Sequence, residues 1–201
     1  MNAFHRSCCL AALALTLAGC ETMSYSLVPV GARQVGSLEF DVAGAWNTVP
    51  PMMPPAARDD AQTWTRNGML LDRFYVIPAV KDGQPIFKQH DESEALPTFR
   101  AGMLPNELME LMESSVVKLF GEGNSVVSTA NLRPYRFGEA PGLLFDFEAT
   151  IVDGPRYKGV VGMIKSGDEL YVLMYMGADP YYFDKTLPDA TAQIQSARLK
   201  T

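Results

Sequence analysis

The segment from Leu143 to Met176 restricts the fold more than any other part of the chain. Three apolar runs follow one another there, separated by the turn signals Asp153-Gly154-Pro155 and Gly167-Asp168. Gly and Asp tolerate the backbone angles of tight turns. Parallel neighbours need a crossover of about a dozen residues, which turns this short cannot supply. The segment therefore predicts antiparallel strands.

The side chains along these strands alternate with the period of a sheet. The first strand carries apolar residues on one face and polar residues on the other: Leu143, Phe145, Phe147, Ala149 and Ile151 opposite Asp146, Glu148 and Thr150. The last strand, Leu170 to Met176, is apolar on both faces, which predicts a sheet covered on both sides. Leu70 to Val80, between Asn67-Gly68 and Asp82-Gly83, predicts a further strand.

Two segments have the spacing of amphipathic helices. Pro105 suits the first position of a helix, Glu107 its first turn, and Gly121 or Gly123 its end. Between them, apolar residues recur at helical spacing: Leu108, Leu111, Met112, Val116 and Leu119. A second stripe lies near the C-terminus: Phe183, Leu187, Ala190, Ile194 and Ala197. We expect Pro188 at the start of that helix, after a separate turn. An antiparallel sheet covered by helices is an α+β fold.

The order of these elements resembles the PsbP-like (Mog-type) α/β/α sandwich over Val35 to Leu199. The resemblance rests on the helix start Pro105-Asn106-Glu107-Leu108, the strand meander, and the closing helical segment Tyr181 to Leu199, which ends in Ser196-Ala197-Arg198-Leu199. The organisation is also similar to that of DcrB-type envelope lipoproteins. The resemblance implies a binding or assembly factor rather than an enzyme.

The N-terminus has the anatomy of a secretory signal. Arg6 precedes an apolar run, Leu10 to Leu17, that is too short to span a bilayer. The following Leu17-Ala18-Gly19-Cys20 resembles the lipobox of bacterial lipoproteins, whose Cys receives diacylglycerol before the signal is removed. The resemblance implies a signal peptide over residues 1–19 and a lipid, including palmitate, on Cys20. The alternative is an ordinary secretory signal with an incidental Cys.

Cleavage before Cys20 would change the length, net charge and cysteine content of the chain. Removal of 19 residues from the 201 leaves 182, and the loss of Arg6 takes the net charge from −6 to −7. Cys8 and Cys9 leave as well, so no disulfide is possible within the mature chain. We expect a lipidated tether over residues 20–33 and one globular domain over 34–201. In enterobacterial lipoproteins, an Asp directly after the lipidated Cys retains the protein in the inner membrane. By that resemblance, Glu21 at this position favours the periplasmic face of the outer membrane.

A proline-rich stretch interrupts the domain from Val49 to Pro55, where four prolines exclude a helix interior or a central strand. We interpret it as a stiff surface loop, with a polyproline recognition segment as the alternative.

Residues for catalysis or metal binding are few. Outside the signal the one histidine is His90, in a charged segment that we interpret as a solvated loop. Two carboxylate pairs, Glu39 with Asp41 and Asp146 with Glu148, each share a strand face at a spacing of roughly 7 Å. Neighbouring strands would let the four bind a hard cation or act as acid and base. We favour polar strand faces instead, and expect no metal and no cofactor.

Three functions remain, since a sequence pI near 4.9 argues against nucleic-acid binding. The first is a non-enzymatic envelope lipoprotein whose domain binds another envelope protein as an adaptor or assembly factor. The second is a carrier or sensor of a lipid or other apolar ligand held between sheet and helix. The third is a hydrolase that uses His90 or the carboxylates.

Overall fold

The computed structural model describes residues 25–50, 58–88 and 95–200, and more of them lie in β-strands than in helices. A large antiparallel sheet has the strand order β1-β4-β5-β6-β10-β9-β8-β7, and a small sheet has the order β11-β3-β2. The large sheet contains β1 (Ser26–Val28), β4 (Trp46–Thr48), β5 (Gln62–Thr65), β6 (Asp72–Lys81), β7 (Ser125–Phe137), β8 (Ala140–Ile151), β9 (Arg156–Ser166) and β10 (Glu169–Ala178). The small sheet contains β2 (Gly31–Val35), β3 (Leu38–Val42) and β11 (Arg198–Leu199).

The antiparallel meander expected from Leu143 to Met176 is confirmed by β8, β9 and β10. Consecutive strands pair antiparallel, with Asp146 opposite Val160 and Tyr175 opposite Val160 on its other side. The strand expected over Leu70 to Val80 is present as β6, which begins at Asp72 and pairs with β10. These four strands build the centre of the large sheet.

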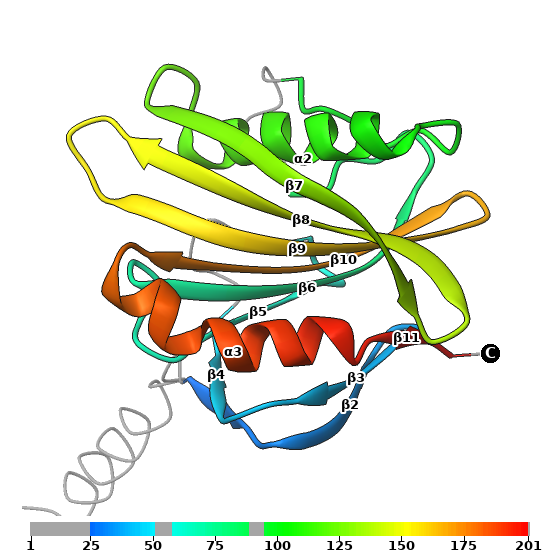
Figure 1. Cartoon of the computed structure of the whole chain (residues 1–201), viewed down its shortest axis with the longest axis horizontal. Helices are drawn as coiled ribbons and strands as arrows, with labels where there is room; N and C mark the ends of the chain where they lie inside the picture. Colours follow the sequence, from blue (N-terminus) through cyan, green and yellow to red (C-terminus); the bar gives the residue numbers. More distant parts are fainter. Residues whose placement is uncertain (1–24, 51–57, 89–94, 201) are drawn as a thin grey trace, which may run out of the picture.

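At the centre of the sheet both faces are buried, as the apolar pattern of β10 predicts. On one face, Leu170, Val172, Met174 and Met176 join a core beneath helix α2 (Pro105–Phe120). On the other face, Tyr171, Leu173 and Tyr175 join a second core beneath helix α3 (Tyr181–Gln195). Figure 1 shows α2 above the sheet and α3 below it, beside the small sheet.

Helix α2 begins and ends where the sequence predicts. Pro105 occupies the first turn, where its missing N–H leaves no bond unmade. The Glu107 carboxylate reaches back to accept a hydrogen bond of 2.6 Å from the Leu104 N–H. Gly121 follows the last turn with φ +90°, a conformation that favours glycine.

Helix α3 differs from the expectation at its start. It begins at Tyr181, so Pro188 lies inside the helix and the separate turn expected before it does not form. Pro188 lacks an N–H and removes one internal hydrogen bond. Burial of Phe183, Thr186, Ala190 and Ile194 against the second core stabilises both halves of the helix around this gap.

The structure has more β-sheet and less helix than the expected α+β fold class. The expected antiparallel sheet with a helix on each face is present, but the described residues form a mostly β structure with two helices rather than an α/β/α sandwich. The second face is covered by α3 together with the small sheet, whose Leu38, Phe40 and Val42 enter the same core.

Regular structure begins before residue 34, the expected start of the globular domain. Strand β1 and the first three residues of β2 fall within residues 20–33, the range expected to be a lipidated tether. Val28 is fully buried opposite Trp46, and Ala32 pairs with Asp41. The short length of β1 and its few apolar residues explain why the pattern does not reveal it. The segment expected to be a signal peptide and Cys20 lie outside the described residues.

Candidate functional site

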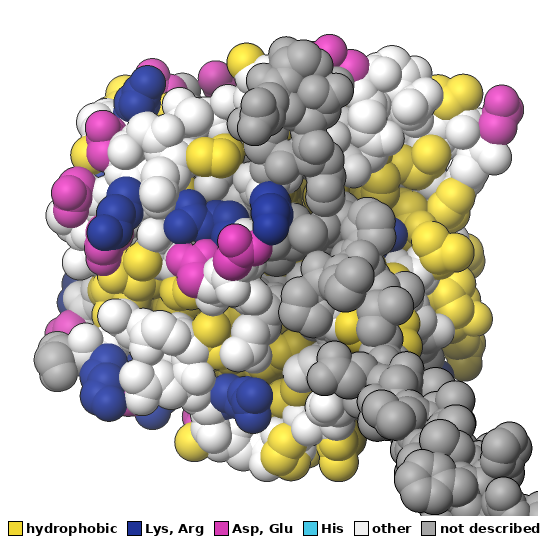
Figure 2. Space-filling view, turned by 180° about the vertical axis from the view of Figure 1, so that it is seen from behind, with side chains coloured by type: hydrophobic (Ala, Val, Ile, Leu, Met, Phe, Trp, Pro, Cys, Tyr) yellow, Lys and Arg dark blue, Asp and Glu magenta, His cyan; other side chains and the backbone are white. Residues whose placement is uncertain are grey.

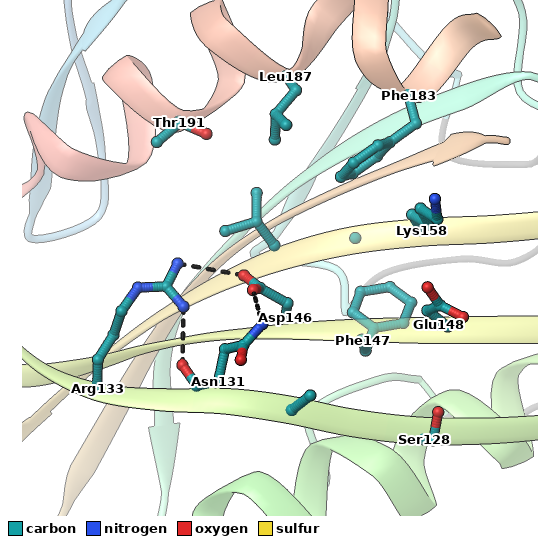
Figure 3. Close-up of a pocket in the computed structure, with 13 residues that line it drawn as sticks. Ser128, Asn131, Arg133, Asp146, Phe147, Glu148, Lys158, Phe183, Leu187 and Thr191 are labelled. Carbon is teal, nitrogen blue, oxygen red and sulfur yellow. Dashed lines mark hydrogen bonds and ion pairs between the residues drawn. The ribbon is translucent and has the colours of Figure 1, made fainter. Parts of the chain in front are cut away.

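A groove lies between α3 and the outer strands β7, β8 and β9. Its volume is about 490 Å³. Figure 3 shows side chains of α3 along one wall and side chains of the three strands across the floor. The lining residues are Ser128, Ala130, Asn131, Arg133, Asp146, Phe147, Glu148, Lys158, Gly159, Val160, Phe183, Leu187 and Thr191.

Two glycines set the close approach of α3 that forms this groove. A Cβ at Gly177 would lie 2.8 Å from the Phe183 Cα, and one at Gly162 would lie 2.5 Å from the Ile194 Cγ2. Contacts this short would force the helix away from the sheet. Helix α3 packs on β10 and β9, so the face of β7 and β8 beyond it is left open.

The wall of the groove is apolar. Phe183 and Leu187 project from α3 toward the strands (Figure 3). Val160 of β9 also lines the groove. The Phe183 ring stacks on the buried Tyr175 ring, with centroids 5.8 Å apart and planes 14° apart. This stacking fixes the wall to the core, so the groove is preformed rather than created by a mobile side chain.

A β-bulge shapes the floor at one end. The pairing of β7 with β8 shifts between Ala130 and Arg133, where Asn131 adopts a φ of +55°. The bulge turns two side chains toward the Asp146 carboxylate, which accepts hydrogen bonds of 2.8 Å from Asn131 and 3.1 Å from Arg133. Bulges commonly reposition side chains beside functional sites.

A second ion pair fixes the other end of the floor. The Asp179 carboxylate is 3% exposed and bridges Lys158, at 3.0 Å, and Arg156. Hydrogen bonds from Lys158 and then from Arg156 hold the pKa of the Asp179 carboxyl below its usual range. Asp179 directly precedes the first turn of α3, so these pairs join the helix start to β9.

The Glu148 carboxylate in the groove is not neutralised by an ion pair of this kind among the described residues. Glu148 lies opposite Lys158 in the strand register and opposite Ser128 on β7. Within the described residues, its carboxylate accepts no hydrogen bond and forms no ion pair, although its charge raises the pKa of Arg156 after the larger effect of Asp179. The groove therefore combines an apolar wall with an accessible carboxylate.

The Asp179 pairs give a pH dependence with a defined sign. A carboxyl whose pKa is lower in the folded chain stabilises it above the unfolded pKa of about 3.9, and the contribution disappears as pH falls through the folded value. We expect the Tm of the native chain to fall more steeply below about pH 4 than the Tm of Asp179→Asn. Calorimetry across this range checks it. Asp153→Asn, in an exposed turn, is the control and keeps the native slope; equal slopes for all three would contradict the assignment.

The two carboxylate pairs of the sequence do not meet. Glu39 and Asp41 lie on β3 of the small sheet, and Asp146 and Glu148 lie on β8 of the large sheet. Glu39 pairs with Arg198 at 3.2 Å. The four-carboxylate site is thus not formed, and each pair is a polar strand face. Among the described residues, no three His, Cys, Asp or Glu side chains gather as a metal site.

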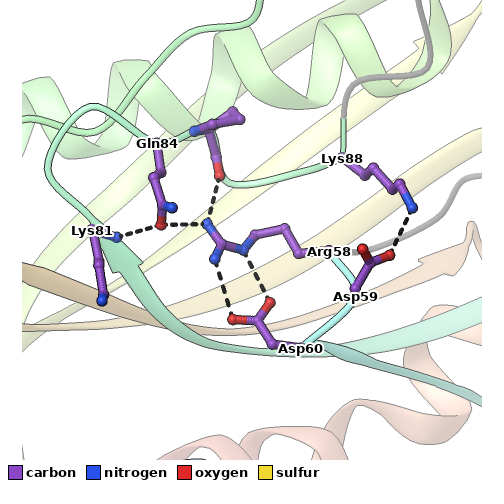
Figure 4. Close-up of polar contacts among 7 residues, drawn as sticks. Arg58, Asp59, Asp60, Lys81, Gln84 and Lys88 are labelled. Carbon is purple, nitrogen blue, oxygen red and sulfur yellow. Dashed lines mark hydrogen bonds and ion pairs between the residues drawn. The ribbon is translucent and has the colours of Figure 1, made fainter.

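A second hollow is lined only by charged side chains. Figure 4 shows Arg58 between Asp60 and Gln84, and Lys88 beside Asp59. The nearest atoms of Arg58 and Asp60 lie 3.1 Å apart, and those of Lys88 and Asp59 lie 2.7 Å apart. The Lys88 contact lowers the pKa of the Asp59 carboxyl. These charges neutralise one another, so the hollow offers less to a ligand than the groove does.

Comparisons with known proteins identify the architecture. No protein-family model matches the sequence, and no curated protein matches it. The solution structure of cyanobacterial PsbP (CyanoP) from Synechocystis sp. PCC 6803 is similar, with a TM-score of 0.58 over 90% of this chain and 96% of that chain. The chain has a PsbP-like fold. Identity over the match is 10%, so the likeness concerns the fold alone.

Sequence reasoning located only part of the groove in this PsbP-like fold. Asp146 and Glu148 were singled out, but their partners on β7 were not, because Ser125–Phe137 lacks strong apolar alternation. The one available signal was Asn131, a residue type that tolerates positive φ, shortly before Pro134. His90 lies outside the described residues. Within the described part, no helix is long and apolar enough to cross a membrane.

Proposed function

We propose that this chain is a cell-envelope lipoprotein, anchored through acylated Cys20 at the periplasmic face of the outer membrane, whose PsbP-like domain binds another envelope protein without catalysing a reaction. The anchor is supported by the order of Arg6, the apolar run and Leu17-Ala18-Gly19-Cys20. The binding role is supported by one observation above all, the preformed groove between α3 and the strands β7 to β9.

The chemistry of the groove favours a protein segment as its occupant. Phe183, Leu187 and Val160 suit an apolar side chain, and the carboxylate of Glu148 suits a neighbouring cation or a backbone N–H. Arg133 and Lys158 are already engaged by Asp146 and Asp179. Because these pairs hold the floor in place before binding, little ordering has to accompany the arrival of a partner.

The free edge of β7 is less suited to a partner than the groove. The outward N–H of Thr129 donates a hydrogen bond of 3.0 Å to the Glu113 carboxylate of α2. Pro134 carries no N–H, and the bulge at Asn131 bends the strand between these two points. Such features prevent an edge strand from pairing with another chain. The partner is therefore expected to contact side chains rather than to extend the sheet.

A lipid or apolar-ligand carrier is the second candidate, because the groove volume of about 490 Å³ falls within the range of small-molecule sites. Its position between sheet and helix is also the one expected for such a ligand. The charged floor disfavours a purely apolar molecule, since Asp146, Glu148, Lys158 and Arg133 line it.

Crosslinking in cells separates the two candidates. A photoreactive amino acid replaces Thr191 on the groove wall in the full-length chain, which is then purified from membranes for mass spectrometry. We expect one reproducible protein partner. Stoichiometric lipid with no protein partner would instead establish the carrier.

A matched pair of variants tests whether the groove itself is responsible. Ser128→Arg places a long cation over the floor beside Glu148, and Val126→Arg places the same side chain two residues earlier on the same strand face, outside the groove. We expect Ser128→Arg to lose most of the crosslinked partner and Val126→Arg to keep it. Equal recovery from both variants would place the partner elsewhere.

A further inference from the structure

The first described residues form an uncharged and exposed strip, Tyr25–Ala32, which we call the N-terminal strip. It contains no charged side chain, and seven of its eight residues are exposed. Three of them are large and hydrophobic: Tyr25 is 46% exposed, Leu27 66% and Val30 64%. In a chain with 20% charged residues, this is an unusual surface to present to water.

The strip is fixed to the domain rather than loosely attached. Val28 is fully buried against the second core. The Ser26 N–H donates a hydrogen bond of 3.0 Å to the Thr48 Oγ1, and the Thr48 hydroxyl donates one of 3.2 Å to the Ser26 carbonyl. Strand β1 is the last strand at its end of the large sheet, with no described strand on its outer side. The exposed side chains of the strip therefore have a set orientation relative to the sheet.

The position of the strip along the chain points to what covers it. Four residues separate Tyr25 from Cys20. Covalent geometry alone therefore limits the distance from Tyr25 to the Cys20 Cα to about 18 Å. We propose that the N-terminal strip lies against the bilayer that receives the lipid of Cys20, with Leu27 and Val30 at the boundary of headgroups and acyl chains. This inference rests on the proposed lipid anchor.

The chemistry of the strip fits such a boundary. Aliphatic side chains gain free energy on leaving water, and tyrosine is enriched at membrane interfaces. No charged group has to be desolvated between residues 25 and 32. In Figure 1 the strip lies at the bottom of the domain, and Figure 2 shows hydrophobic side chains at the lower rim of the opposite view. A lipid anchor with a second contact of this kind restrains orientation as well as position.

This contact would determine where the groove faces. Strand β1 is at one edge of the large sheet, and the strands β9, β8 and β7 that form the groove floor are at the other. Adjacent strands lie about 4.8 Å apart. The floor strands are five to seven steps from β1, so they lie about 24 to 34 Å from it across the sheet. A domain resting on β1 thus holds the groove away from the membrane that anchors it, where a soluble or opposing partner can enter.

A single labelled thiol tests the contact. After signal removal the chain has no free thiol, because Cys8 and Cys9 are gone and the Cys20 sulfur is acylated. Leu27→Cys is therefore labelled selectively with an environment-sensitive NBD fluorophore in the full acylated protein. Val152→Cys is the matched control, since Val152 is a hydrophobic residue 57% exposed in the β8–β9 turn. Both proteins are reconstituted into vesicles of phosphatidylethanolamine and phosphatidylglycerol.

Phospholipids with a doxyl quencher on the acyl chain then report proximity. We expect them to quench the label at position 27 at least about threefold more than the label at 152, as for a side chain at the acyl boundary. Equal, weak quenching at both positions, in protein that carries its acyl chains and stays with the vesicles, would overturn this inference and leave the anchor intact. Protein that lacks acyl mass and does not bind the vesicles would overturn the anchor and the inference together.

Discussion

Replacing Trp46 by alanine is expected to lower the free energy of unfolding by about 4 kcal/mol, near the upper end for a buried aromatic residue. Trp46 is fully buried where α3 crosses the sheet. Its ring lies 5.4 Å from that of Phe74 and 6.2 Å from that of Tyr175. Native domains typically have a free energy of unfolding of about 5–15 kcal/mol, so this loss would remove a large share of the stability.

Polar contacts add to this packing. The Trp46 Nε1 donates a hydrogen bond of 3.1 Å to the Gln193 Oε1 of α3. The Arg66 guanidinium lies 4.3 Å from the centre of the Trp46 ring, and it also pairs with Asp189 of α3 at 2.7 Å. Alanine at position 46 would remove the partner of the buried Gln193 Oε1, and the Gln193 Nε2 already has no partner among the described residues.

Urea unfolding of the purified chain measures the effect, with Trp46→Phe as the control. Phenylalanine keeps most of the ring packing and loses only the hydrogen bond, so we expect a loss of about 1–2 kcal/mol. An alanine variant within about 1 kcal/mol of the native chain would show that α3 is held by other contacts. Because Trp46 supports the helix that forms the groove wall, the alanine variant is also expected to capture less partner.

The sequence was informative where one residue pattern decides one local structure. Alternation in Leu143 to Ile151 and turn residues at Gly167-Asp168 define β8 to β10, because strand period and turn length are local properties. The start of α2 was equally clear, since Pro105 and Glu107 act within a single turn. In these segments the prediction and the structure agree.

The remaining elements depend on distant parts of the chain. The three residues of β1 have too little pattern to identify, and Trp46 and Trp64 hold that region only through long-range contacts. Helix α3 contains Pro188 because the buried face on either side outweighs one lost hydrogen bond. Local rules place a proline at a helix start, but burial of the apolar face in the tertiary structure extends α3 on both sides of Pro188.

The groove illustrates the same limit. Asp146 and Glu148 could be placed on one strand face from alternation, but their partners depend on the register of β7 and on the bulge at Asn131. Sequence alone left open a cation site shared with Glu39 and Asp41, although it favoured polar strand faces. The topology instead separates the two pairs by sheet, which no single-chain pattern reveals.

Replacing Cys20 by serine is expected to abolish acylation of the chain completely. A serine hydroxyl does not form the thioether to diacylglycerol that the lipobox resemblance implies, and the signal would not be removed by the lipoprotein peptidase. Each buried methylene contributes about 0.8 kcal/mol to membrane binding, so two or more acyl chains would anchor the native protein stably. Intact mass and incorporation of labelled palmitate are the readouts. Fractionation alone is insufficient, because the uncleaved apolar run, Leu10 to Leu17, can itself retain a precursor at the membrane.

The signal segment supplies a matched control. Cys8→Ser with Cys9→Ser removes two thiols from the part that is cleaved away, so the mature protein should keep its acyl mass, its palmitate label and its 182 residues, 19 fewer than the 201 of the precursor. A native protein without acyl mass, cleaved at another residue, would show an ordinary secretory signal with an incidental cysteine. The domain would then be free of the membrane, and a partner would have to be sought in solution. Retention of the label in Cys20→Ser but not in the Cys8 and Cys9 variant would move the modification into the segment now assigned to the signal.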